Sequence, residues 1–118
     1  MIAVLADTHM PRGNRHLPER CVEVVGAAEA VILELGRSIV AITHDAGPAK
    51  GRVARLRRRF PSASAVVFGH SHLPLHEVEG DFQIFNPGSP TERRRAPRAS
   101  MGLLELRRSG LAFEHIWL

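Results

Sequence analysis

The sequence predicts a mixed α/β domain in which a sheet of buried strands is covered by a few helices. Short apolar runs rich in valine, isoleucine and alanine recur along the chain and stop at polar or glycine residues. Strands that are buried on both faces show this pattern. Between two of these runs, residues 52–60 repeat their apolar side chains at helical spacing among arginines. A chain of 118 residues suits one domain, and we expect it to span 1–118.

The first half of the chain predicts three strands and one helix. Residues 1–6 are a continuous apolar run that stops at Asp7, and a polar loop follows over 7–17. Pro18 suits the first turn of a helix over 18–28. Two further apolar runs are separated by Gly36-Arg37, which predicts a tight turn between strands at 30–35 and 38–43.

The second half predicts one helix, one more buried strand and two hairpins. The helix covers 52–60, with its apolar stripe against the sheet, and the strand covers 64–69. Gly80-Asp81 predicts the turn of a hairpin over 75–85. After a loop, two strands around Ser109-Gly110 complete the pattern, so the second hairpin spans 101–118.

Composition and charge narrow the class of protein. The single cysteine excludes an internal disulfide, which favours a reducing, cytoplasmic setting. No apolar run approaches the roughly 20 residues of a membrane helix, so no membrane association is expected. The net charge is +4, but the arginine-rich stretches 55–60 and 92–95 carry no interleaved aromatic residues, which argues against nucleic acid as the partner.

Three of the apolar runs lead into histidines and aspartates. The first ends in Asp7-Thr8-His9, the run over 38–43 ends in His44-Asp45, and the run over 64–69 ends in His70-Ser71-His72. Ligand sites in open α/β sheets form beyond the carboxyl ends of the strands, so parallel neighbours would bring these loops together. Imidazole and carboxylate groups are a ligand set for Mn²⁺, Fe, Zn²⁺ or Ni²⁺. The pattern therefore predicts a metal site.

Four segments carry a family resemblance: "ADTH", "THD", "FGHSHLPL" and "NPGSPTERR". In this order they resemble the calcineurin-like metallophosphoesterase superfamily, specifically its small bacterial and archaeal phosphodiesterase branch, to which the eukaryotic retromer subunit of the same fold also belongs. The resemblance implies a β-sandwich flanked by helices, with two metal ions at the strand ends. It also implies the ligands: Asp7, His9 and His72 for one ion, and His44 and His70 for the other.

The same resemblance implies roles around the metals. His44 and His70 would be the catalytic histidines at the phosphoryl group. Asn86 and Ser89, in the "NPGSP" loop, would lie near the substrate mouth and contact the substrate.

One part of the family pattern is absent. Family members carry a G-D motif, whose aspartate bridges both metals, and a G-N-H-D motif before the "THD" strand. Here "AEAVI" passes directly into "LELGRSIVAITHD", so a central strand-helix portion is missing and the chain reads as internally shortened near 32–33. Asp45, Glu34 or a carboxylate of a second subunit could replace the aspartate, or the chain could hold a single ion. A sheet left uncovered in this way predicts a homodimer or poor solubility.

The functional expectation is a metal-dependent phosphoesterase that hydrolyses phosphodiesters with a metal-activated hydroxide. The expected substrate is a small-molecule phosphate ester, and the expected cofactor is one or two divalent ions, Mn²⁺ before Ni²⁺, Zn²⁺ or Fe. The alternative is a catalytically impaired protein of the same fold that acts as a binding scaffold, as the retromer subunit suggests.

Overall fold

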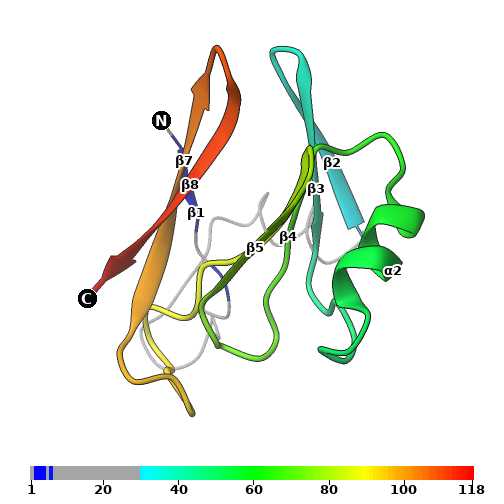
Figure 1. Ribbon diagram of the computed structural model, residues 1–118. Helices are drawn as coiled ribbons and strands as arrows, with labels where there is room; N and C mark the ends of the chain where they lie inside the picture. The colour runs from blue at the N-terminus through cyan, green and yellow to red at the C-terminus, as the bar shows by residue number, and fades with distance from the viewer. Residues whose placement is uncertain (1, 5, 7–29) are drawn as a thin grey trace.

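Two β-sheets packed face to face form the body of the molecule (Figure 1). The structure, a computed structural model, describes residues 2–4, 6 and 30–118. The elements in chain order are β1 Ile2–Val4, β2 Ala30–Leu35, β3 Ser38–Thr43, α2 Arg52–Arg59, β4 Ala65–Val67, β5 Leu75–Glu79, β6 Phe82–Asn86, β7 Ser100–Arg107 and β8 Gly110–Trp117. The predicted α/β class and β-sandwich are confirmed. The predicted loop 7–17 and helix 18–28 lie outside the described residues.

The larger sheet has five described strands in the order β2-β3-β4-β6-β5. Strands β3, β4 and β6 run parallel, while β2 and β5 pair antiparallel with their neighbours through the two predicted hairpins. Gly36 and Gly80 occupy the turns with φ angles of 61° and 60°, a conformation that glycine adopts at little cost. Strands β3 and β4 therefore end at the same edge of the sheet, side by side.

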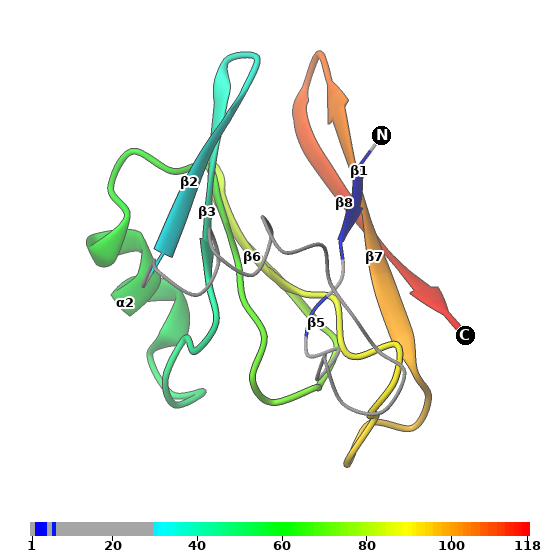
Figure 2. The same cartoon turned by 180° about the vertical axis from the view of Figure 1, so that it is seen from behind.

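The smaller sheet has the described order β1-β7-β8. The predicted hairpin over 101–118 is confirmed, with Arg107 paired to Gly110 across the turn. Strand β1 corrects one expectation: it is not a parallel neighbour of β3 or β4 but pairs antiparallel with β7, Ile2 opposite Leu104 (Figure 2). An apolar run indicates a buried strand but does not encode which strand it pairs with.

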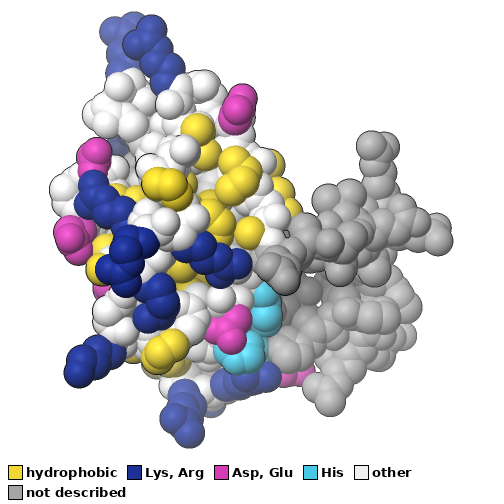
Figure 3. All heavy atoms as spheres, turned by 90° about the vertical axis from the view of Figure 1, so that its right-hand side faces the viewer, with side chains coloured by type: hydrophobic (Ala, Val, Ile, Leu, Met, Phe, Trp, Pro, Cys, Tyr) yellow, Lys and Arg dark blue, Asp and Glu magenta, His cyan; other side chains and the backbone are white. Residues whose placement is uncertain are grey.

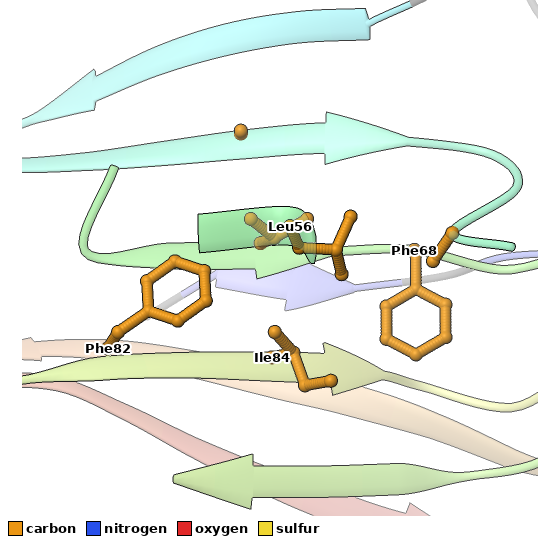
Figure 4. Packing of buried hydrophobic residues seen from close by; sticks show 7 residues of the cluster. Leu56, Phe68, Phe82 and Ile84 are labelled. Carbon is orange, nitrogen blue, oxygen red and sulfur yellow. The ribbon is translucent and has the colours of Figure 1, made fainter. Parts of the chain in front are cut away.

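The outer face of the larger sheet is covered by α2 (Figure 1). Leu56 of the helix is buried and packs with Phe68, Phe82 and Ile84 of the sheet and its loops in one apolar cluster (Figure 4). The arginines on the rest of the helix surround this single buried stripe, as the sequence pattern predicts. This packing fixes α2 next to the loop that follows β3.

A second apolar cluster fills the space between the two sheets. Its buried members are Val40, Ala65, Val67, Phe85 and Leu104. A Cβ atom added to Gly102 of β7 would overlap the Phe85 ring. The two sheets can therefore pack this closely only because residue 102 has no side chain. The alternation of the β3 residues explains both clusters, since Val40 faces the other sheet and Ala41 faces the helix.

Among the described strands, β2 forms one edge of the larger sheet and leaves apolar side chains in solvent. Ile32 is 54% exposed and Leu33 is 39% exposed. An apolar edge strand is a template for pairing with another chain, which agrees with the expected uncovered edge, while dimerisation itself stays a prediction. Within the described residues, no helix has the length and apolar character needed to cross a membrane.

Candidate metal centre

The candidate site lies on two loops that leave the same edge of the larger sheet. His44 and Asp45 follow β3, and His70 and His72 follow β4. The parallel pairing of Ile42 with Val67 places these two strand ends next to each other. The Gly69 N–H then donates a hydrogen bond of 2.9 Å to the carbonyl oxygen of His44. The sheet thus joins the two loops directly, as the sequence predicts for this pair of strands.

Two imidazoles and one carboxylate meet at this point. The His44 and His70 ring centroids are 5.3 Å apart, edge to face. Nε2 of His70 lies 3.9 Å from Oδ2 of Asp45, with both side chains about 60% exposed. Figure 3 shows histidine side chains beside an acidic side chain on the face that also carries the α2 arginines. The three groups therefore share a position that solvent and a ligand can reach.

The Asp45 carboxylate is held in its charged form. The Gly47 N–H donates a 2.8 Å hydrogen bond to Oδ1 of Asp45. This bond, together with the nearby His70, His44 and Arg52, holds the pKa of the carboxyl below its ordinary value, although partial desolvation opposes the shift. Asp45 is consequently an anion throughout the neutral range.

His72 occupies a different environment. Its side chain is buried, and Nδ1 lies within hydrogen-bonding distance of the Glu92 carbonyl oxygen. A carbonyl oxygen only accepts, so this contact requires the proton on Nδ1, and a neutral ring with that proton has its lone pair on Nε2. Metal-ligating histidines are commonly oriented by such a bond to a backbone carbonyl. The contact with Glu92 is of this kind, and the ligand role of His72 stays a prediction.

The backbone at both histidines is in the left-handed region. The φ angles are 74° at His70 and 64° at His72, values that residues with a Cβ atom adopt at a free-energy cost of about 1 kcal/mol or more each. Strain of this kind persists where surrounding contacts enforce it, and it concentrates at functional sites. Two such residues in one three-residue stretch mark this loop out from the other described loops.

Asn86, at the end of β6, contributes buried contacts that hold this loop. Its Nδ2 donates to the Gly69 carbonyl oxygen at 3.3 Å and to Ser71 Oγ at 3.2 Å. Its Oδ1 accepts the Gly88 N–H at 2.9 Å. The side chain is fully buried, so these contacts give Asn86 a positioning role. A direct contact between Asn86 and a substrate stays a prediction, and this burial argues against it.

Ser89 is also buried and is used inside its own loop. Its Oγ accepts the N–H groups of Thr91 at 3.3 Å and Glu92 at 2.9 Å. These bonds shape the turn that presents the Glu92 carbonyl to His72. The predicted substrate contact by Ser89 likewise stays a prediction that its 1% exposure does not favour.

The donor chemistry of the loops fits a divalent metal, because neutral imidazole and carboxylate groups are its usual protein ligands. Among the described residues, however, no three His, Cys, Asp or Glu side chains are gathered closely enough to hold an ion as they stand. The predicted ligands Asp7 and His9 lie outside the described residues. The described loops thus carry donor groups of the kind that bind metals but do not form a metal site by themselves.

The structure decides against one of the proposed replacement carboxylates. Glu34 pairs with Ile39 near the start of β3, whereas His44 follows the end of that strand. At about 3.3 Å per residue, five residues separate the two positions by roughly 16 Å. Because of this distance, Glu34 cannot bridge ions at His44. The expectation rested on the position of Glu34 near the shortened segment of the sequence, which does not determine its position in the sheet.

Comparison with known proteins agrees with this geometry. Residues 27–109 match the model of the calcineurin-like phosphoesterase superfamily domain. The chain belongs to the calcineurin-like phosphoesterase superfamily. The matched segment includes His44, His70 and His72, so the candidate centre lies inside the phosphoesterase domain. No curated protein matches the chain in sequence.

Solved structures show the same phosphoesterase fold. A predicted phosphoesterase from Streptococcus pneumoniae is 22% identical with a TM-score of 0.63, over 75% of this chain and 53% of that one. This chain thus spans about half the length of the Streptococcus protein. A single-residue variant of Vps29 from Entamoeba histolytica is 15% identical with a TM-score of 0.63, over 98% of both chains. Wild-type Vps29 from that organism, complexed with Zn²⁺, is 19% identical with a TM-score of 0.56, over 75% of this chain and 60% of that one.

Two features of the centre had little or no signal in the sequence. The Glu92 carbonyl that orients His72 is a backbone group, which any residue at position 92 would supply. The positioning role of Asn86 depends on a loop 15 to 17 residues away in the chain. An asparagine at a strand end beside "PG" indicates a turn, but it does not indicate which loop the amide contacts.

Proposed function

We propose that the chain is a metal-dependent phosphoesterase that hydrolyses small-molecule phosphodiesters. The observation that supports it best is the strained loop of His70 and His72, fixed by buried hydrogen bonds and joined to His44 at the edge of the sheet. Membership of the phosphoesterase superfamily supplies the reaction class. A loop that only connected two strands would not need two imidazoles in left-handed backbone.

The proposed division of ligands is the one that the family resemblance implies, and the different burial of the histidines agrees with it. His72, buried and oriented by Glu92, would hold one ion together with Asp7 and His9. His44 and His70, at the surface, would hold the other and face the substrate. We propose Mn²⁺ as the ion. A bound divalent metal supplies hydroxide near neutral pH and offsets the charge that develops on the phosphoryl oxygens.

Side chains beside the centre suit an anionic substrate. A cavity of about 270 Å³ lies between the loop after β3 and α2, and it is lined by Asp45, Ala46, Gly47, Arg55, Leu56 and Arg59. Arg55 is engaged by backbone carbonyls of that loop, so the Arg59 guanidinium is the group that would attract a phosphate ester to the edge where His44 and His70 lie. In this proposal Arg59 of α2 has a role in substrate attraction besides keeping its face of the helix in solvent.

The experiment is a hydrolysis assay with bis(p-nitrophenyl) phosphate and Mn²⁺. We expect metal-dependent turnover that falls at least 100-fold in His70→Ala and in His72→Ala, since each change removes a proposed ligand. His76→Ala is the matched control, because His76 is an exposed histidine of β5 whose Nε2 contacts Gln83. Equal loss in the control, or wild-type turnover that does not depend on metal, would contradict the proposal.

A second function remains open because the described residues do not by themselves form a three-ligand site. We propose as the alternative a binding scaffold of the same fold, which the likeness to Vps29 over 98% of both chains supports at the level of fold. A folded wild-type chain without turnover at any tested metal would favour this alternative.

A further inference from the structure

We propose that Asp45 is a metal ligand and that, with His44 and His70, it completes a three-ligand site for one ion. This inference rests on the proposed function, since it takes the two histidine loops to be a metal centre. It adds a carboxylate that the ligand set above does not contain. Two imidazoles alone seldom hold a divalent ion, whereas three protein ligands with an open position are typical of catalytic sites.

Proximity is the first argument. Oδ2 of Asp45 lies 3.9 Å from Nε2 of His70, and Asp45 follows His44 directly in the chain. Two atoms that both bind one ion at about 2.1 Å are roughly 3 Å apart when the angle at the ion is near 90°. The present separation exceeds this by about 1 Å. No three ligand side chains of the described residues are close enough to hold an ion as they stand, so the proposal requires a side-chain rotation at His70 or Asp45, both of which are about 60% exposed.

Orientation is the second argument. The Gly47 N–H binds Oδ1 of Asp45 at 2.8 Å, and the other oxygen, Oδ2, is the one nearest His70. Metal-ligating carboxylates are commonly hydrogen-bonded in this way by their surroundings. One oxygen of Asp45 thus anchors the side chain to its own loop, and the second is left facing the imidazole.

The third argument is the loop that carries Asp45. Nη2 of Arg55 donates to the carbonyl oxygens of Ala46 and Pro48, both at 2.7 Å, and Nη1 donates to that of Lys50 at 3.2 Å. A planar guanidinium holds its donors in a fixed geometry and can bind three carbonyls at once, whereas the donors of a lysine are carried on a flexible stem. Arg55 is thereby a positioning residue, because it fixes the backbone that follows Asp45 in the chain.

A second arginine strengthens the same arrangement. Nη2 of Arg52 donates to the Gly47 carbonyl oxygen at 3.0 Å, so the peptide unit beside the one that binds Asp45 is also held. The N-terminus of α2 has no side-chain cap, and these guanidinium bonds tie the loop to the helix instead. The buried Leu56 anchors that helix to the sheet. Asp45 therefore stands on a rigid support, as a ligand needs.

The experiment is a calorimetric titration of the metal-free chain with Mn²⁺, with Asp45→Asn beside the wild type. Asparagine keeps the shape of the side chain and can still accept the Gly47 N–H, but it lacks the negative charge. We expect wild-type binding and at least a tenfold weaker affinity for one ion in Asp45→Asn. Thermal unfolding of both proteins checks that the fold is retained, and the exposed position of Asp45 predicts that it is.

Asp81→Asn is the matched control. Asp81 is another exposed aspartate, with its side chain 88% exposed beside Arg57, and its loss should leave Mn²⁺ affinity unchanged. Wild-type binding with equal affinity in Asp45→Asn would overturn the role of Asp45 and leave the proposed function standing. A wild-type chain that binds no Mn²⁺ would overturn both. The two failures are therefore distinguishable.

Discussion

Replacing Asn86 with alanine tests how strongly the histidine loop, the segment after β4 that carries His70 and His72, is held to the sheet. The change removes the hydrogen bonds to the Gly69 carbonyl and Ser71 hydroxyl, and it leaves the buried Gly88 N–H without the oxygen it binds at 2.9 Å. A typical buried hydrogen bond contributes about 1 kcal/mol, and a buried donor left unsatisfied costs about 1–3 kcal/mol. We therefore expect Asn86→Ala to lower the free energy of unfolding by about 2 to 4 kcal/mol.

The assay is urea and thermal unfolding followed by circular dichroism. For a domain of this size each kcal/mol shifts the unfolding temperature by about 3 to 5 °C, so a fall of about 10 °C is expected. Gln83→Ala is the control, because Gln83 lies on the same strand and also hydrogen-bonds, to His76 and to the Leu111 carbonyl, but away from the histidine loop. It should cost about 1 kcal/mol.

The loop also gives a functional readout. Without Asn86, the strained backbone at His70 and His72 can relax, so Mn²⁺ affinity should fall in Asn86→Ala and stay unchanged in Gln83→Ala. The reasoning is refuted if Asn86→Ala unfolds within 2 °C of the wild type, roughly half a kcal/mol, or if both variants bind metal equally.

Three further predictions follow from other contacts. Gly88→Ala should unfold the protein at markedly lower temperature, because the added methyl group would overlap Ser100 Oγ at a backbone φ of 76°; thermal unfolding like the wild type would contradict this. Arg55→Met should expose the loop after β3 to limited proteolysis and cost about 1–2 kcal/mol, whereas Arg58→Met, on the exposed side of α2, should change neither property. Ile32→Lys should abolish self-association through the β2 edge in sedimentation velocity, and a wild type that stays monomeric at all concentrations would contradict that expectation.

Local signals predicted most of the described strands and turns. Glycines at positions 36 and 80 need the left-handed backbone that hairpin turns use, and the apolar runs beside them have the length of strands. The stripe of α2 was readable because Leu56 and its neighbours recur at helical spacing. Strand pairing was not readable in this way: β1 joined β7 rather than the parallel strands, because a short apolar run carries no information about its partner.

The sequence predicted which types of residue form the candidate site, but it did not predict how they are arranged in space. His44, His70 and His72 stood out because they follow buried strands. The replacement carboxylate could not be chosen from sequence, since the choice depends on the register of β2, which carries Glu34, against β3, which leads to Asp45. The register puts Glu34 at the far end of the strand and Asp45 beside His70. The hydrogen bonds from Asn86 join loops that follow two different strands, 15 to 17 residues apart in the chain, which no local pattern encodes.

The central claim is that the two histidine loops hold divalent metal for phosphodiester hydrolysis. Anomalous diffraction from crystals of the chain soaked with Mn²⁺ tests it most directly. The account predicts an anomalous peak within about 2.2 Å of the His44 and His70 imidazole nitrogens, with Asp45 turned toward it. Peaks confined to other surfaces, or no peak at the loops in crystals soaked at millimolar Mn²⁺, would contradict it.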